Sequence, residues 1–239
     1  MTQTALLVFA RAAGLMSRAP AFSHPSVPAV VRAGLAAALA FAVAPLVSPS
    51  RQLDLTSFAF ALAGDFVVGA AIGFGASLLY DGAYYAGRTI DDYVGVRGSV
   101  PNANVTSAQA FGRLWSAAFL AAFVLLDGWV PVVRAFAGSF AHVAPGAFVG
   151  PAGWLHVALA LPSTIVRAAF LVAAPAIAVA ASLQLVLAAV ARVVPRFSSF
   201  TLAFPVVFGA VLVVTLISLP LLTPLGARPW LVVPWTVAR

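Results

Sequence analysis

The stretch AAFLVAAPAIAVAASLQLVLAAVA, at residues 168–191, has no charged side chain and is long enough to cross a bilayer as a helix, which needs about 20 apolar residues. Two more charge-free runs cover residues 33–50 and 197–227. Over all 239 residues, 63% are hydrophobic and 8% are charged, whereas soluble domains carry roughly 25% charged residues. The composition therefore predicts an integral membrane protein with several helical spans.

The hydropathy pattern predicts an all-α membrane protein with about six hydrophobic helical segments, arranged as hairpins in one membrane domain, residues 1–239. The expected segments are residues 3–22, 29–47, 57–80, 114–130, 168–191 and 197–222. The first two form an N-terminal hairpin within residues 1–50, because the connection SHPSVP between them is short and breaks helices. The last two form a C-terminal hairpin, residues 168–222.

Residues 130–167 are apolar but rich in proline and glycine, which argues against one continuous helix. Broken or half-helices are expected there, and Pro175 and Pro205 are expected to kink the last two segments. Irregular backbone at membrane depth is tolerated only where protein or a water-filled cavity covers it. This region is therefore predicted to pack inside an assembly.

One polar segment, DGAYYAGRTIDDYVGVRGSVPNANVTSAQAFGR at residues 81–113, interrupts the apolar runs. It contains Asp81, Asp91 and Asp92, half of the six acidic residues of the chain. Such a segment must lie outside the bilayer or line something wet within protein. The choice between these two places decides what the protein does.

Charged and small residues inside the apolar segments predict helix contacts. An unpaired charge at bilayer depth costs at least about 2.5 kcal/mol on insertion scales, so Arg11 and Asp65 are expected to form an ion pair. A proton relay through Asp65 is the alternative. Gly69 and Gly73 have the small-xxx-small spacing that lets another backbone approach closely, either in ordinary helix packing or against another subunit.

The sequence contains no pattern typical of catalysis or of cofactor binding. It has no cysteine, its three histidines lack the spacing of metal ligands, and no phosphate-binding glycine motif or Ser/His/Asp order stands out. The 13 basic residues are scattered and form no basic block. We therefore expect no enzyme, no metal or cofactor, and no nucleic-acid partner.

Several short motifs follow one another in a characteristic order. They are R-x-x-G-L-M-S-x-A-P-x-F at residues 11–22, V-R-x-G-L-A at 31–36, A-G-R-T-I-D at 86–91 followed by Gly95, S-F at 139–140, and A-R-V-V-P-R-F-S-S-F-T-L-A-F-P at 191–205. Together they resemble the FliR/SctT family, the export-gate proteins of bacterial type III secretion in flagella and in injectisomes. Residue chemistry and this resemblance together select the candidate anchor and helix-packing residues: Arg11, Pro20, Arg32, Asp65, Gly69, Gly73, Ala86, Gly87, Asp91, Pro195, Phe197 and Pro205.

The resemblance implies a structural and gating subunit in the bacterial inner membrane, at the export apparatus of the flagellar basal body. One copy would join FliP/SctR-type and FliQ/SctS-type subunits in a helical hetero-oligomeric gate, with an FlhB/SctU-type switch protein at the entrance. Unfolded export substrates would pass through its channel. The motif A-H-V-A-P-G after Ser139-Phe140 resembles the flagellar pattern and favours a flagellar system over an injectisome.

The resemblance also implies a plug loop, which here falls at roughly residues 95–108. The candidate channel plug consists of Gly95, Val96, Arg97, Gly98, Ser99, Val100, Pro101, Asn102, Ala103, Asn104 and Val105. These residues are mostly short, are interrupted by glycine and proline, and carry almost no charge, so they could fill a lumen and yield without forming a regular element.

Two other classes of function stay open at this point. A small secondary transporter is suggested by the proline-broken region before Pro175 and by Asp65 within a span. A membrane-embedded enzyme is disfavoured because no catalytic constellation is recognisable.

Overall fold

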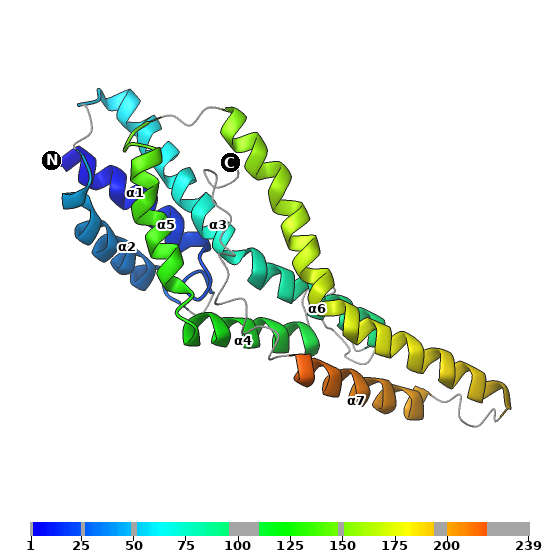
Figure 1. Ribbon diagram of the computed structural model, residues 1–239. Coiled ribbons are helices and arrows are strands. Elements are labelled where there is room, and N and C mark those ends of the chain that lie inside the picture. Colours follow the sequence, from blue (N-terminus) through cyan, green and yellow to red (C-terminus); the bar gives the residue numbers. More distant parts are fainter. Residues whose placement is uncertain are drawn as a thin grey trace. The chain divides into compact units, whose positions relative to one another are not determined.

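A computed structural model describes residues 2–24, 27–48, 52–95, 110–147, 151–193 and 200–218, and within these ranges every regular element is a helix (Figure 1). In chain order they are α1 (Thr2–Arg18), α2 (Ala29–Val43), the short 3-10 helix η1 (Ala44–Leu46), α3 (Leu55–Val94), α4 (Ala110–Leu125), α5 (Trp129–His142), α6 (Pro151–Val193) and α7 (Phe200–Ser218).

Three helical stretches of the described residues are long and apolar enough to cross a membrane: Ala29–Leu46, Leu55–Leu78 and Ala173–Val193. A fourth span results if the bent pair of α4 and α5 counts as one. In lipid a helix is favoured because it satisfies its own backbone hydrogen bonds. The predicted class, an all-α membrane protein, is therefore confirmed.

Helix α3 is longer than the predicted segment 57–80. It begins after Asp54, whose carboxylate accepts hydrogen bonds from Thr56 and Ser57, and these hydrogen bonds lower the pKa of Asp54 to about 2. It then continues to Val94, through the first part of the polar segment. The reason is an amphipathic pattern: Ala83, Ala86, Ile90 and Val94 recur at helical spacing and are all buried.

The proline-rich region is broken in one place and helical in another. The expected break lies between α5 and α6, where Gly146 has a positive φ of 77°. The expectation of broken helices up to residue 167 is wrong, because α6 begins at Pro151 and runs without interruption for 43 residues. Proline is tolerated at the first position of a helix, and inside membrane helices neighbouring groups satisfy the backbone that a proline frees.

The predicted segment 114–130 also differs from the structure. Helix α4 ends at Leu125, and α5 begins anew at Trp129. Between them Asp127 adopts a left-handed conformation with φ 52°, and the Gly128 N–H donates to the carbonyl oxygen of Phe123 at 2.7 Å. A non-glycine residue with positive φ ends a helix, so this turn separates two elements that hydropathy merges.

The chain divides into two compact units, each with its own contacts. The first contains the described parts of Met1–Leu78 and Phe123–Ser163, and the second those of Leu79–Ala122 and Thr164–Ala227. The first unit therefore holds α1, α2, α5 and the start of α3. The second holds the end of α3, most of α4, the greater part of α6, and α7.

In the first unit, α1 and α3 touch backbone to backbone. A Cβ atom added at Gly69 would lie 1.8 Å from the carbonyl oxygen of Arg11, and one added at Gly14 would lie 2.0 Å from that of Phe66. A Cβ atom at Gly73 would meet the carbonyl oxygen of Leu15 at 2.6 Å. The small-xxx-small pair Gly69 and Gly73 is thus occupied by α1 of the same chain, and the interpretation as a contact with another subunit is wrong at these two positions.

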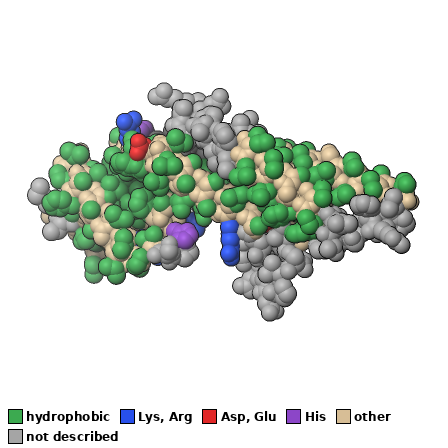
Figure 2. All heavy atoms as spheres, turned by 90° about the horizontal axis from the view of Figure 1, so that it is seen from below, with side chains coloured by type: hydrophobic (Ala, Val, Ile, Leu, Met, Phe, Trp, Pro, Cys, Tyr) green, Lys and Arg blue, Asp and Glu red, His purple; other side chains and the backbone are tan. Residues whose placement is uncertain are grey.

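The surface of the described residues is largely apolar. Figure 2 shows hydrophobic side chains over most of the coloured face, with only a few charged groups. Phe41 on α2 is 85% exposed and Phe60 on α3 is 81% exposed. Surfaces of this kind are stable only against lipid or other protein.

Candidate functional site

A buried ion pair joins α1 to α3 in the first unit. Arg11 Nε donates a hydrogen bond to Asp65 Oδ1 at 2.7 Å, and Arg11 Nη2 is also in ion-pair contact with that oxygen. The Arg11 side chain is fully buried and that of Asp65 almost fully. The two residues that the sequence pairs across the first and third helical segments are thus in direct contact.

The remaining groups of this pair bind α5 and the turn that follows it. Arg11 Nη1 donates to Ser139 Oγ at 2.9 Å and to the carbonyl oxygen of Val143 at 3.0 Å. Asp65 Oδ2 accepts a hydrogen bond from the Gly146 N–H at 2.8 Å. The ring of Phe140 lies under the guanidinium, with its centroid 4.1 Å from Cζ.

These contacts give the pair a structural character. Buried charges are tolerated when they are paired and their other donors and acceptors are satisfied. Here Arg11 Nε and Nη1 and both carboxylate oxygens of Asp65 have hydrogen-bond partners, whereas Arg11 Nη2 has only its ion-pair contact with Asp65. Val143 ends α5, so Arg11 also places a positive charge at the negative end of that helix. Both carboxylate oxygens of Asp65 are engaged by fixed donors, an arrangement that favours an anchor over a proton relay.

A second polar cluster lies where α3 ends and α4 begins, in the second unit. Asp91 Oδ1 accepts a hydrogen bond from the Phe111 N–H at 2.8 Å, and Asp91 Oδ2 accepts one from the Gly112 N–H at 3.1 Å. The Asp91 side chain is fully buried. Because α4 begins at Ala110, these two N–H groups belong to its first turn. The N–H groups of a first turn have no acceptor within their own helix. We call this contact the Asp91 clamp.

A close backbone approach surrounds the Asp91 clamp. A Cβ atom at Gly87, one turn before Asp91, would lie 2.5 Å from Gly112 Cα and 2.5 Å from the carbonyl oxygen of Phe111. Only glycine at position 87 therefore lets α3 and α4 meet at this distance. Gly95 follows the last residue of α3 with φ 81°, the left-handed conformation that commonly ends a helix.

Several other predicted residues have defined places. Ala86 is buried on α3, Pro20 is buried in the turn after α1, Arg32 is half-buried on α2, and Pro205 is exposed inside α7. Of the candidate plug, Gly95 alone lies within the described residues. The rest of the plug, and also Pro195 and Phe197, lie outside them.

Sequence reasoning missed the partners of the two clusters. Ser139 stands in the S-F motif and Gly146 in a helix-breaking stretch, so both carried a visible signal. The carbonyl of Val143 and the N–H of Phe111 carried none, because every residue has such groups.

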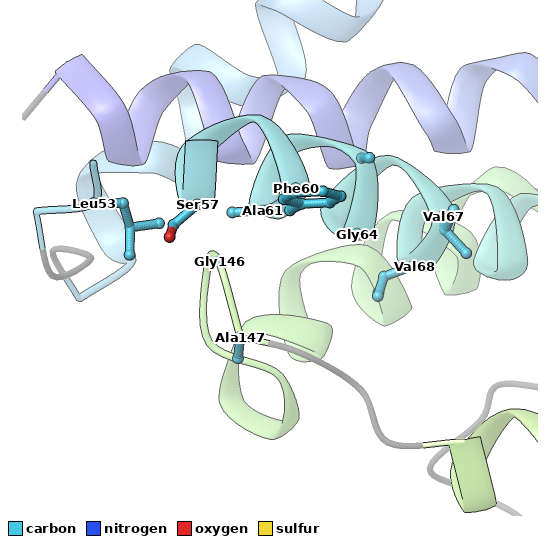
Figure 3. Close-up of a pocket in the computed structure, with 10 residues that line it drawn as sticks. Leu53, Ser57, Phe60, Ala61, Gly64, Val67, Val68, Gly146 and Ala147 are labelled. Atoms are coloured by element: carbon cyan, nitrogen blue, oxygen red, sulfur yellow. The ribbon is translucent and has the colours of Figure 1, made fainter. Parts of the chain in front are cut away.

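An apolar groove of about 480 Å³ runs along the start of α3 in the first unit. Figure 3 shows Phe60, Gly64 and Val67 on the helix, with Gly146 and Ala147 on the turn facing it. The hydroxyl of Ser57 is the one polar side-chain group among its lining residues, and none of them is titratable. Within the described residues there is also no group of three or more potential metal ligands. The groove can make apolar contacts but offers no reactive group.

The architecture and the two clusters define a class: an all-α membrane protein whose buried charges hold helices together. A sequence profile described as bacterial export proteins, family 1, matches residues 2–230. The chain belongs to this family, and the resemblance of its motifs to FliR/SctT proteins is confirmed.

Two relatives match nearly the whole chain. The flagellar biosynthetic protein FliR of Escherichia coli (strain K12) is 27% identical over 221 residues, covering 90% of this chain and 83% of the relative. The flagellar biosynthetic protein FliR of Aquifex aeolicus (strain VF5) is 26% identical over 229 residues, covering 92% of this chain and 86% of the relative.

Proposed function

We propose that this chain is a structural and gating subunit of a bacterial type III export apparatus, and that it forms part of the channel for unfolded flagellar substrates. The observation that carries the proposal is the family match over residues 2–230, together with two FliR relatives aligned over about nine tenths of the chain. The name of both relatives favours a flagellar system over an injectisome. The expected place is the inner membrane at the flagellar basal body.

Physical features of the described residues support a passive role. Asp65, the acidic residue inside a candidate span, is held by Arg11 and by the Gly146 N–H. The apolar groove contains no titratable group that could couple transport to an ion. Both features weigh against the alternative of a small secondary transporter, which needs an accessible ion or substrate site.

The apolar surface supports assembly with other subunits. Side chains such as Phe41 and Phe60 project from helices and are more than four fifths exposed. FliP/SctR-type and FliQ/SctS-type subunits, with an FlhB/SctU-type switch protein at the entrance, are the partners that the family implies. Protein neighbours or lipid would remove this surface from water.

We also propose that residues 95–105 contribute the channel plug. Their composition of small, uncharged and helix-breaking residues suits a segment that blocks a lumen and can be displaced. The Asp91 clamp supports this role, because it holds one end of the segment close to the start of α4.

The plug can be tested by deleting residues 100–105 from the full chain, expressed with its partner subunits. We expect assembly to persist and the membrane to leak small ions, because the deletion removes bulk from the closed lumen. Conductance across the membrane measures the leak, and co-purification of the partners measures assembly. A control that replaces the same residues by Gly and Ser at constant length separates loss of bulk from shortening. An assembled deletion variant with unchanged conductance would count against a plug.

A further inference from the structure

We infer that Arg32 is a binding site for an anionic phospholipid, at the end of the hairpin that α1 and α2 form in the first unit. The lipid phosphate binds the guanidinium, and an acyl chain runs along the exposed face of α2. All the residues that carry this inference are described ones, and it does not rest on the proposed function.

Arg32 has a positive charge that the first unit does not neutralise. Its Nε is buried and has no hydrogen-bond acceptor among the described residues. Residues 1–53 contain no acidic side chain. The acidic residues of the first unit are Asp54, Asp65 and Asp127, and within the described part of that unit none of them forms an ion pair with Arg32. A partly buried donor of a charged group is costly without an acceptor, so this arginine suits an anion from outside the chain.

The depth of Arg32 in its helix favours a lipid headgroup as the source of that anion. The candidate span Ala29–Leu46 begins three residues before Arg32, which places its Cα atom about 4.5 Å from the end of the span. An arginine side chain this close to a helix end can extend to the headgroups of the bilayer. Arg11 shows the contrast, because it is enclosed by protein and is neutralised by Asp65 of the same chain. A protein carboxylate is required where headgroups cannot reach, and Arg32 lies where they can.

The surroundings of Arg32 suit a molecule with both a phosphate and an apolar chain. Arg32 lies at the border of two faces of α2: Ala36, one turn later, is buried, whereas Val31 and Leu35 are 49% and 38% exposed. At Gly34 an added Cβ meets nothing within 4 Å, so the surface beside these side chains is open. An acyl chain can cover this apolar surface while the guanidinium donates two parallel hydrogen bonds to the phosphate.

A second arginine at the same end of the hairpin provides a matched control. Helix α2 packs against α1, and Arg18 is the last residue of α1 (Figure 1). Arg18 is exposed, and its guanidinium lies over the ring of Phe74, with Cζ 5.0 Å from the centroid. It therefore has a partner in the protein. Arg18 adds to the general attraction for an anionic membrane surface, whereas Arg32 forms the site itself.

The experiment measures lipid binding by native mass spectrometry on the full chain, purified from membranes with the subunits that accompany it. Phosphatidylglycerol is the anionic probe, and phosphatidylcholine, which has no net charge, is the neutral one. We expect the unchanged chain to bind phosphatidylglycerol more tightly than phosphatidylcholine.

Three variants then test the role of the guanidinium. Arg32→Gln should weaken the binding of phosphatidylglycerol by about tenfold or more, the factor that corresponds to losing a hydrogen bond between charged groups. Arg18→Gln should weaken it by about fivefold or less, the share of one arginine in a general surface attraction. Arg32→Lys keeps the charge without the paired donors, so its affinity should lie between those of the unchanged chain and Arg32→Gln.

Four outcomes would overturn the inference. Equal weakening in Arg32→Gln and Arg18→Gln would show a general attraction in place of a site. Displacement of phosphatidylglycerol by inorganic phosphate alone would show a site for a free anion. If Arg32→Gln binds phosphatidylglycerol normally but loses an accompanying subunit, a carboxylate of that subunit is the counter-ion. An unchanged chain without preference for phosphatidylglycerol overturns the site without any variant, so the test holds even if Arg32→Gln does not assemble.

Discussion

Individual buried charges in this protein act as structural ties. Arg11 and Asp65 neutralise each other. Arg11 Nη1 also donates to Ser139 and Val143, and Asp65 Oδ2 accepts from Gly146. Removing one charge of such a pair leaves the other buried without compensation, whereas removing both leaves no uncompensated charge. The two cases have different energetic consequences, which makes the role of the pair measurable.

At this scale we predict that Arg11→Met or Asp65→Asn alone lowers the stability of the folded chain by about 3–5 kcal/mol, the usual cost of breaking a buried pair. The double variant Arg11→Met with Asp65→Leu should recover much of the loss. Thermal unfolding of the purified complex measures all three variants. Arg134→Met, at an exposed arginine on α5, is the control and should change little. Equal loss in the single and double variants would show that the charge itself is required.

Among the elements, α1 and α3 depend on glycine for their contact. The same helix α3 carries Gly69, where a Cβ would meet the backbone of Arg11, and Gly64, where nothing lies within 4 Å. Close backbone contact between membrane helices is stabilised by packing, since lipid supplies little hydrophobic driving force. Alanine substitutions at these two glycines therefore distinguish the effect of helix packing from the effect of helix propensity within the same helix.

We predict that Gly69→Ala forces α1 and α3 apart and destabilises the first unit by about 1–3 kcal/mol, the typical cost of overpacking. Gly64→Ala should leave folding unchanged or improve it slightly, because alanine favours a helix over glycine. The stability of both variants can be measured as the protease resistance of the membrane-embedded chain at increasing concentrations of a denaturing detergent. Similar effects of the two substitutions would contradict the α1–α3 contact.

For the molecule as a whole, the apolar surface predicts dependence on partners. We expect the chain expressed alone to aggregate after extraction in mild detergent, and to become monodisperse when it is co-expressed with FliP-type and FliQ-type subunits. Exposed side chains such as Phe41 and Phe60 are the reason, because they need a lipid or protein neighbour. Size-exclusion chromatography and co-purification are the measurements. A lone chain that stays monodisperse and catalyses ion-coupled uptake would support the transporter alternative.

The extent of α3 shows how far sequence patterns reach. Its apolar half was predictable from hydropathy. Residues 81–94 carry so many polar side chains that the mean hydropathy of this stretch does not indicate a helix. The buried residues Ala83, Ala86, Ile90 and Val94 have helical spacing. A search for the helical periodicity of apolar residues would therefore have extended the predicted helix through this stretch. The start of α6 at Pro151 was less accessible, because proline both begins helices and breaks them.

The sequence by itself determined that this is a helical membrane protein and which family it belongs to. Long charge-free runs can remain in lipid only as structures that satisfy their own backbone hydrogen bonds, and the order of short motifs matches one family. The tertiary structure alone decided which groups meet: Arg11 with Asp65 and the end of α5, and Asp91 with the first turn of α4. Such contacts depend on how helices distant in the chain pack, and their backbone partners leave no trace in residue identity.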